Sequence, residues 1–112
     1  MAEQIRSWRG VVERGEVFTA EREVAAMLDL VRAETKRVES RFLDPTCGTG
    51  NFLVEVLRRK LGVIRARCDG SVGEYRRLVL LALRGMWGVE IQPDTARECR
   101  ARLRELVEKD AR

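Results

Sequence analysis

The sequence of 112 residues contains no histidine, only two prolines and few aromatic side chains. Its three cysteines, Cys47, Cys68 and Cys99, are widely spaced and odd in number, and no histidine accompanies them. This pattern argues against a disulfide framework and against a zinc site. Without a histidine to activate it, Cys47 is expected to be a small turn residue rather than a nucleophile. We therefore expect no metal site and a reducing, cytoplasmic environment.

Long hydrophobic runs are also missing. The longest one, residues 78–83, is far too short to span a bilayer, and no apolar block follows the charged N-terminal residues. We expect no membrane association and no secretory signal. The length fits one small domain over residues 1–112. The net charge of +4 would suit a nucleic-acid partner, but a bias of this size is common in other proteins and has little weight by itself.

The spacing of apolar residues predicts an alternating α/β chain. Helices are expected over residues 20–39, 51–61 and 74–84 and from Pro93 onward, and strands near Phe42 and over residues 86–91. Gly62 is expected to break the helical pattern, so residues 63–67 form a short segment of uncertain type. This order predicts a parallel sheet whose second strand lies beside the first.

The helices carry more specific expectations. The first should pack on the sheet through Val24, Met27, Leu28, Val31 and Val38. Arg58, Arg59 and Lys60 should complement the dipole at the end of the second. The last helix is expected to bury Ala96, Cys99, Leu103, Leu106 and Val107, and to pair Glu98 with Arg102 and Arg104 with Glu108.

A glycine turn between the first strand and the second helix is the most informative stretch. Asp44 and Pro45 end the strand, and Gly48 and Gly50 allow backbone angles and close approaches that a Cβ would block. The helical pattern begins at Asn51, so the free N–H groups of its first turn point back at the turn. A polar or anionic ligand is expected there.

A nicotinamide dinucleotide site fits this turn poorly. The position of the third small residue of that fingerprint is Leu53. The next acid in a suitable place, Glu90, lies 46 positions beyond Asp44, whereas the fingerprint has about 20. A dehydrogenase is therefore not favoured.

Three segments, residues 15–19, 44–53 and 87–94, resemble motifs of DNA amino-methyltransferases, above all the adenine-specific enzymes of restriction–modification systems. The segment Asp44-Pro-Thr-Cys-Gly-Thr-Gly-Asn-Phe-Leu53 resembles the family's first cofactor motif. Gly15-Glu-Val-Phe-Thr19 resembles its N-terminal cofactor-contact motif, and Trp87-Gly-Val-Glu-Ile-Gln-Pro-Asp94 its second-strand motif. The resemblance implies S-adenosylmethionine as the ligand and a partial Rossmann-like methyltransferase fold, a short parallel sheet flanked by helices. One departure is Ala20, where the family usually has proline.

The resemblance also implies roles for individual residues. Glu90, at the end of the second strand, would accept hydrogen bonds from the ribose hydroxyls, and Ile91 would rest against the adenine ring. The turn and the Phe18-Thr19 segment would hold the methionine part. Taken alone, a glutamate in the place of Glu90 is more often a solvated strand end, and Thr19 is explained at least as well as a helix cap. The expected cofactor-binding residues are Phe18, Thr19, Asp44, Pro45, Cys47, Gly48, Gly50, Asn51, Glu90 and Ile91.

The catalytic motif of the family, Asn/Asp-Pro-Pro-aromatic, is absent, because the two prolines, Pro45 and Pro93, are far apart. No region for target recognition is apparent either. We expect no catalytic residue here. The leading hypothesis is an incomplete S-adenosylmethionine-binding domain, the N-terminal part of an adenine-specific DNA methyltransferase, which is inactive alone and meets DNA only through the complete enzyme.

Two other hypotheses remain open. The chain could be a non-catalytic interaction module or split-enzyme subunit that completes its sheet with a partner chain, or it could self-associate through the exposed sheet edge. It could also be a small basic nucleic-acid binder that uses the arginines of the last two helices. Glu98, Glu105 and Glu108 lie among those arginines and weaken the third hypothesis.

Overall fold

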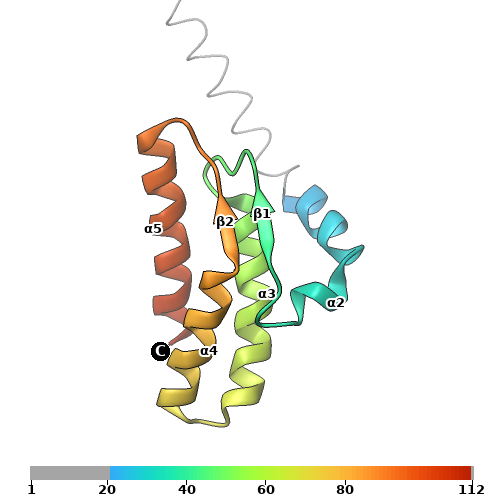
Figure 1. The fold of residues 1–112 in the computed structure, drawn as a ribbon, viewed down its shortest axis with the longest axis vertical. Helices are drawn as coiled ribbons and strands as arrows, with labels where there is room; N and C mark the ends of the chain where they lie inside the picture. The colour runs from blue at the N-terminus through green and yellow to red at the C-terminus, as the bar shows by residue number, and fades with distance from the viewer. Residues whose placement is uncertain (1–20, 112) are drawn as a thin grey trace, which may run out of the picture.

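The structure, a computed structural model, describes residues 21–111 (Figure 1). Residues 21–29 are helical, and the predicted site residues Phe18 and Thr19 lie outside the described range. The elements that follow are α2 (Arg32–Thr35), β1 (Phe42–Asp44), α3 (Asn51–Cys68), α4 (Val72–Arg84), β2 (Met86–Gly88) and α5 (Pro93–Asp110).

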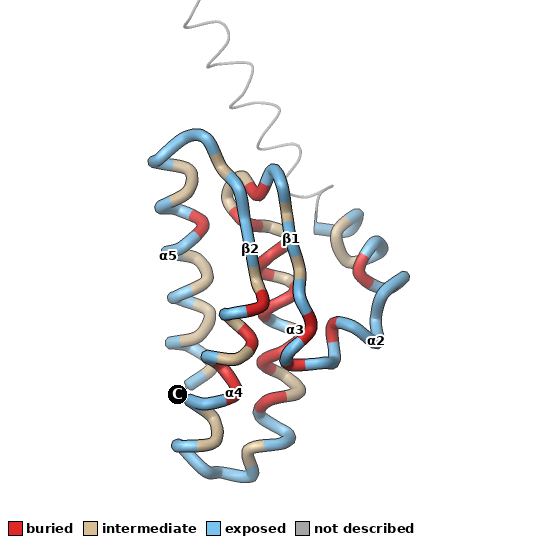
Figure 2. Tube along the Cα trace, in the orientation of Figure 1, coloured by how far each residue is buried: buried red, intermediate tan, exposed pale blue. Residues whose placement is uncertain are grey.

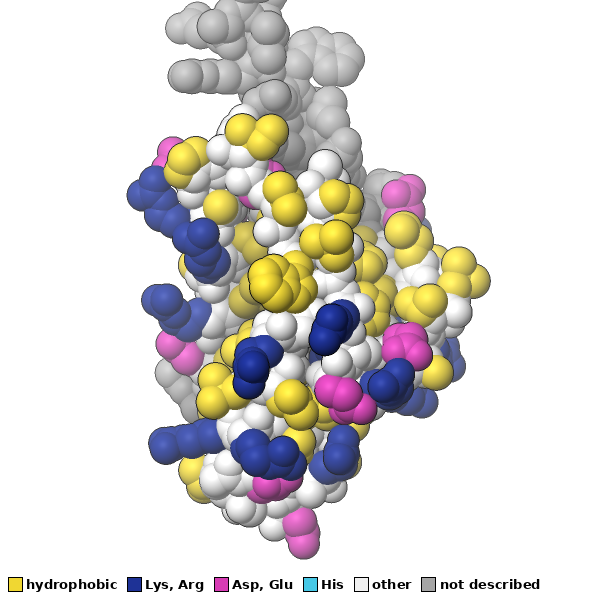
Figure 3. Space-filling view, viewed as in Figure 1, with side chains coloured by type: hydrophobic (Ala, Val, Ile, Leu, Met, Phe, Trp, Pro, Cys, Tyr) yellow, Lys and Arg dark blue, Asp and Glu magenta, His cyan; other side chains and the backbone are white. Residues whose placement is uncertain are grey.

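The two strands form a parallel sheet, as predicted, in which Phe42 faces Met86 and Asp44 faces Gly88. Figure 1 shows α3 behind the sheet and α5 beside it. The opposite face of the sheet is bare within the described part of the chain: Leu43 is 63% exposed and Trp87 62%. Hydrophobic side chains gather over this face (Figure 3). The structure therefore confirms a compact α/β arrangement that is consistent with part of a Rossmann-like fold.

The main core lies between α3 and α4. Leu57, Leu61 and Ile64 of α3 are nearly inaccessible to solvent, and they pack with Leu78 and Ala82 of α4. Figure 2 shows buried positions concentrated along α3, whereas α5 is mostly half-buried or exposed. Only Cys99 of the five residues predicted to be buried on α5 is fully buried. Among the described elements α5 packs mainly against α3, so it is covered on one side only.

The predicted helix over residues 20–39 is wrong in its length. Val31 leaves the helical conformation, with φ −120° and ψ 35°, and α2 ends at Thr35. Local side-chain bonds compete with the helix here: the Thr35 hydroxyl donates to the Arg32 carbonyl at 2.7 Å, and the Ser40 hydroxyl donates to the Glu34 carbonyl at 2.5 Å.

The predicted packing of this region on the sheet is also wrong, because it contacts α3. Arg59 of α3 binds Asp29 at 2.9 Å and the carbonyl of Ala25 at 3.3 Å. Of the predicted apolar face, Leu28 and Val38 are buried, whereas Met27 and Val31 are exposed. Because the helix is interrupted at Val31, the predicted residues do not form one continuous helical face.

Helix α3 continues through Gly62 to Cys68, seven residues beyond its predicted end. A glycine inside a helix costs about 1 kcal/mol relative to alanine, and the burial of Ile64 against α4 offsets that cost. The helix ends instead at Asp69 and Gly70, which both have positive φ. The segment 63–67 is therefore helical.

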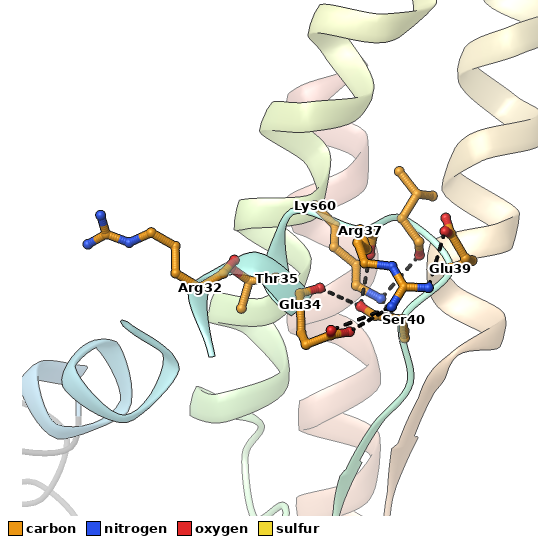
Figure 4. A network of polar contacts seen from close by, with 8 residues as sticks. Arg32, Glu34, Thr35, Arg37, Glu39, Ser40 and Lys60 are labelled. Atoms are coloured by element: carbon orange, nitrogen blue, oxygen red, sulfur yellow. Dashed lines mark hydrogen bonds and ion pairs between the residues drawn. The ribbon is translucent and has the colours of Figure 1, made fainter. Parts of the chain in front are cut away.

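The basic cluster of α3 lies in the middle of the helix and does not complement its dipole. Arg58 and Arg59 form ion pairs with Glu55 on the same helix. Lys60 is fully buried and donates to the carbonyls of Val38 at 3.1 Å and Ser40 at 2.5 Å (Figure 4). The three residues thus have different structural roles, and the proposed common role is wrong.

The remaining boundaries agree more closely with the sequence. Helix α4 begins two residues before its predicted start, where the Ser71 hydroxyl accepts from the Glu74 N–H at 3.2 Å, and Gly85 ends it as predicted. Helix α5 begins at Pro93 as predicted. Strand β2 ends at Gly88, three residues earlier than predicted. None of the described helices is long and apolar enough to cross a membrane.

Candidate functional site

The carboxyl ends of the two strands are joined by backbone hydrogen bonds. The Val89 N–H donates to the Asp44 carbonyl, and the Cys47 N–H donates to the Val89 carbonyl, both at 3.0 Å. These bonds bring the turn after β1 against the residues that follow β2. The turn and Glu90, which are 40 positions or more apart in the sequence, therefore form one surface.

The turn itself has a fixed backbone. The Asp44 carboxylate accepts from the Thr46 N–H at 3.1 Å, and the Cys47 carbonyl accepts from the Gly50 N–H at 2.8 Å. Gly48 has φ +53° and Gly50 has φ +93°, both in the region that favours glycine. A Cβ at Gly50 would lie 2.6 Å from the Cys99 sulfur, whereas one at Gly48 would have no atom within 4 Å. A glycine is therefore required at position 50, because Cys99 packs against it, whereas the space beside Gly48 is open.

Gly88 of β2 is a second glycine at which the backbone packs closely against other side chains, and this packing was not predicted from the sequence. A Cβ there would lie 2.9 Å from the Cys47 sulfur and 2.9 Å from Leu53 Cδ1. A glycine inside an apolar strand pattern is the signal that could have found it. Gly88 therefore allows β2 to lie directly against the turn.

The start of α3 differs from the starts of the other long helices described. Its N-cap is Gly50, no side chain caps it, and its first turn contains no acidic residue. The Ser71 side chain caps the N-terminus of α4, and Glu74 lies in its first turn. The first turn of α5 contains Asp94. The N–H groups of this first turn have no side-chain cap among the described residues, and with the positive end of the α3 dipole they would favour a polar or anionic ligand.

Glu90 and Ile91 follow β2 at the same edge of the sheet. One carboxylate oxygen of Glu90 accepts from the Gln92 N–H at 3.0 Å, which leaves the other oxygen without a partner among the described residues. The neighbouring Ile91 side chain is 93% exposed. Because Glu90 and Ile91 are adjacent in the chain, the carboxylate and the exposed apolar side chain can contact the polar and apolar parts of one ligand.

A cavity of about 270 Å³ lies beneath this surface, between β2, α5 and the start of α3. Its lining includes Cys47, Leu53, Gly88, Glu90, Cys99 and Arg100. Two larger hollows lie elsewhere, one beside Tyr75 and Val107 and one beside Asp29 and Arg59, and neither contains a predicted site residue. The described site residues that the sequence predicted therefore lie at the carboxyl ends of the strands and not at the larger hollows.

The two cysteines at this cavity are packing residues. Burial raises the pKa of the Cys47 thiol, and the Asp44 and Glu90 carboxylates raise it further. Burial and the neighbouring Cys47 also raise the pKa of Cys99, to about 11. Both thiols are therefore protonated at neutral pH, the unreactive form of cysteine. Within residues 21–111 no group of three or more metal-ligating side chains is placed to hold a metal ion.

Arg102 of α5 is a further residue of the site that the sequence did not reveal. Its guanidinium donates to the Thr49 carbonyl at 2.8 Å, to the Thr49 hydroxyl at 3.4 Å and to the Asn51 side-chain oxygen at 2.9 Å. The predicted pairs of Glu98 with Arg102 and of Arg104 with Glu108 do not form. The ion pairs described within α5 are Arg97 with Asp94 and Lys109 with Glu105.

The structure thus places those predicted site residues that it describes in two adjoining groups. The turn contributes Asp44, Pro45, Cys47, Gly48, Gly50 and Asn51, and the segment after β2 contributes Glu90 and Ile91.

Comparison with known proteins gives a partial similarity. The chain is 36% identical over 56 residues to DNA methyltransferase A of Bacillus subtilis (strain 168), a match that covers 46% of this chain and 6% of that protein. The chain thus spans only a small part of this relative. No family model matches the chain, and no solved structure matches it. The similarity supports a relationship to a methyltransferase.

Proposed function

We propose that this chain binds S-adenosylmethionine as the cofactor-binding part of an adenine-specific DNA methyltransferase, of the restriction–modification type and cytoplasmic. The observation that carries the proposal is the joining of the glycine turn, the uncapped start of α3 and Glu90 at the carboxyl ends of two parallel strands. Ligands of open α/β sheets bind at this edge. The order of the three motifs and the similarity to DNA methyltransferase A support the same conclusion.

The residues present fit the chemistry of this cofactor. The methionine part is charged, and it would be held by the turn from Asp44 to Asn51, where Gly48 leaves open space and the α3 N–H groups are donors. Glu90 would accept from the ribose hydroxyls, and Ile91 would contact the adenine ring. Phe18 and Thr19 would add contacts to the methionine part. When bound, the cofactor supplies a methyl group on a positively charged sulfur.

The chain is proposed to lack the residues that would bind the methyl acceptor. It contains no Pro-Pro sequence and hence no Asn/Asp-Pro-Pro-aromatic motif for a flipped adenine. The complete enzyme would supply that motif and the contacts with DNA. The expected activity of the isolated chain is therefore cofactor binding without methyl transfer.

A second candidate function is a split-enzyme subunit or interaction module that completes its sheet with a partner chain. The bare sheet face with exposed Leu43 and Trp87 favours it, since parallel sheets are normally covered on both faces. Self-association through the exposed sheet edge would instead be expected of a fragment of a larger enzyme, because an incomplete sheet leaves that edge unpaired.

Calorimetric titration with S-adenosylmethionine tests the leading proposal. We expect the intact chain to bind, and Glu90→Ala to weaken binding about tenfold or more, because each hydrogen bond to a charged group contributes about 1.5–3 kcal/mol. Glu98→Ala, an exposed acid of α5, is the matched control and should bind normally. Absence of binding by the intact chain would contradict the proposal.

Two further assays separate the candidates. Transfer of a labelled methyl group to DNA by the purified chain alone would show that the missing-motif argument is wrong. Co-purification of a stoichiometric partner that carries an Asn-Pro-Pro motif would favour the split enzyme. Self-association without such a partner would favour a fragment of a larger enzyme.

A further inference from the structure

Arg102 connects α5 to the glycine turn over a long distance in the sequence. One nitrogen of its guanidinium, Nη1, is within 2.8 Å of the Thr49 carbonyl oxygen and 2.9 Å of the Asn51 side-chain oxygen. The side chain is half-buried, and Glu98, one helical turn earlier, is not its partner. The arginine is thus held by neutral acceptors of the turn rather than by a nearby acid.

These contacts fix the orientation of the peptide between Thr49 and Gly50. Its carbonyl oxygen accepts from Arg102, and its N–H donates to the Cys47 carbonyl at 2.8 Å. Because a peptide unit is planar, holding both groups leaves it no freedom to rotate. Gly50 itself has φ +93°, a conformation that glycine adopts readily and other residues rarely adopt.

The same arginine orients the first residue of α3. Because the Asn51 side-chain oxygen accepts from Arg102, the amide NH₂ of Asn51 is left as its donor for another group. The N–H groups of the first α3 turn follow directly after the fixed peptide. Arg102 therefore contacts both neighbours of Gly50 at the start of α3, although it belongs to another helix.

We infer that Arg102 is a positioning residue that aligns the turn and the first turn of α3 with the methionine part of the cofactor. The inference rests on the proposed function and adds that different residues recognise the methionine part and the adenosine part. Glu90 and Ile91 precede α5 and would contact the adenosine part, and neither forms a described hydrogen bond with Arg102. Loss of Arg102 should therefore weaken recognition of the methionine part selectively.

The test compares two ligands, S-adenosylmethionine and adenosine, by calorimetric titration of the intact chain and its Arg102 variants. Arg102→Met should weaken binding of S-adenosylmethionine about tenfold and leave adenosine binding within about twofold. Arg102→Lys should recover part of the loss, because an ammonium can donate to one of the acceptors. Arg104→Met, at an exposed position of the same helix, is the matched control and should change neither affinity.

The outcomes separate this inference from the proposed function. If the intact chain does not bind S-adenosylmethionine, both are wrong. If it binds and Arg102→Met binds equally well, only the role of Arg102 is wrong. A loss of both ligands to the same extent in Arg102→Met, without recovery in Arg102→Lys, would show a general structural role and would overturn the inference. Unchanged adenosine binding also shows that the variant is folded.

Discussion

The two ends of the short sheet differ in how closely side chains and backbone pack around them. At the amino ends of the strands, here termed the closed end, Lys60 is fully buried against the carbonyls of Val38 and Ser40. A Cβ at the neighbouring Gly85 would lie only 2.7 Å from the Ser40 carbonyl oxygen. At the carboxyl ends, here termed the open end, Gly48 has space beside it and Ile91 is 93% exposed.

This difference indicates which residues hold the fold and which are available for a ligand. At the closed end, polar groups are buried and paired, so that removing one leaves others unsatisfied. At the open end, Glu90 and the start of α3 have capacity for further hydrogen bonds within the described residues. Changes at the closed end should therefore affect stability, and changes at the open end should mainly affect binding.

Gly50 is the exception at the open end, and its substitution should have the largest effect on stability. Gly50→Ala should cost about 3 kcal/mol or more, since it adds backbone strain at φ +93° to an overlap with the Cys99 sulfur. Gly48→Ala, which adds strain alone, should cost about 1–2 kcal/mol. Urea denaturation measures both. Adding Cys99→Ala to Gly50→Ala should recover part of the loss, and equal costs at the two glycines would contradict the packing argument.

Lys60→Met should destabilise the closed end by about 1–3 kcal/mol, because the carbonyls of Val38 and Ser40 lose their buried donor. Arg58→Met, at an exposed position of the same helix, is the control and should change the free energy of unfolding by less than about 0.5 kcal/mol. The measurement is again urea denaturation. If Lys60→Met proved as stable as the wild type, the ammonium would not be holding the strand starts.

Tyr75→Phe should cost about 1 kcal/mol, since it removes a hydrogen bond of 2.7 Å from the tyrosine hydroxyl to the Asp110 carboxylate. This bond joins α4 to α5 away from the strand ends, so cofactor binding should not change. Burial and Asp110 raise the pKa of Tyr75 from 10.0 to about 12.

Because the folded-state pKa of Tyr75 is above the unfolded value, the stabilisation is complete below pH 10 and is lost as the pH rises through about 12. Thermal unfolding of the wild type and of Tyr75→Phe should therefore converge over this range. A phenol that titrates near its ordinary pKa in the folded chain would show that the hydrogen bond to Asp110 is not maintained.

Glu90→Ala should have the smallest effect on stability, less than about 0.5 kcal/mol. Its described hydrogen bond is a local one, to the Gln92 N–H two residues away. The same variant should lose cofactor affinity, as set out above. A large loss of stability would instead mean that Glu90 belongs to the framework of the fold and that the open end is not free for a ligand.

The sequence predicted those parts of the fold that are determined by local residues. Gly50 and Pro93 mark the starts of α3 and α5, and the apolar residues at Phe42 and Met86 mark the strands. It did not predict that α3 continues through Gly62, because that continuation depends on burial of Ile64 against α4. Local patterns do not contain such tertiary contacts.

The candidate site could be predicted in part for the same reason. The turn residues and Glu90 form recognisable motifs, and the structure brings the described ones to one edge of the sheet. Arg102 could not be found in this way, because its acceptors at Thr49 and Asn51 are more than 50 positions away in the sequence. Because Arg102 lies four residues after Glu98 in a helix, the sequence predicted a surface ion pair between them instead.

The most direct test of the open end as the cofactor site is an amide ¹H–¹⁵N NMR titration of the intact chain with S-adenosylmethionine. The account predicts large shifts for Gly48, Gly50, Asn51 and Ile91, and little change for Val38, Ser40 and Lys60 at the closed end. Shifts confined to the closed end or to the hollow beside Tyr75, or no shifts at saturating cofactor, would contradict it.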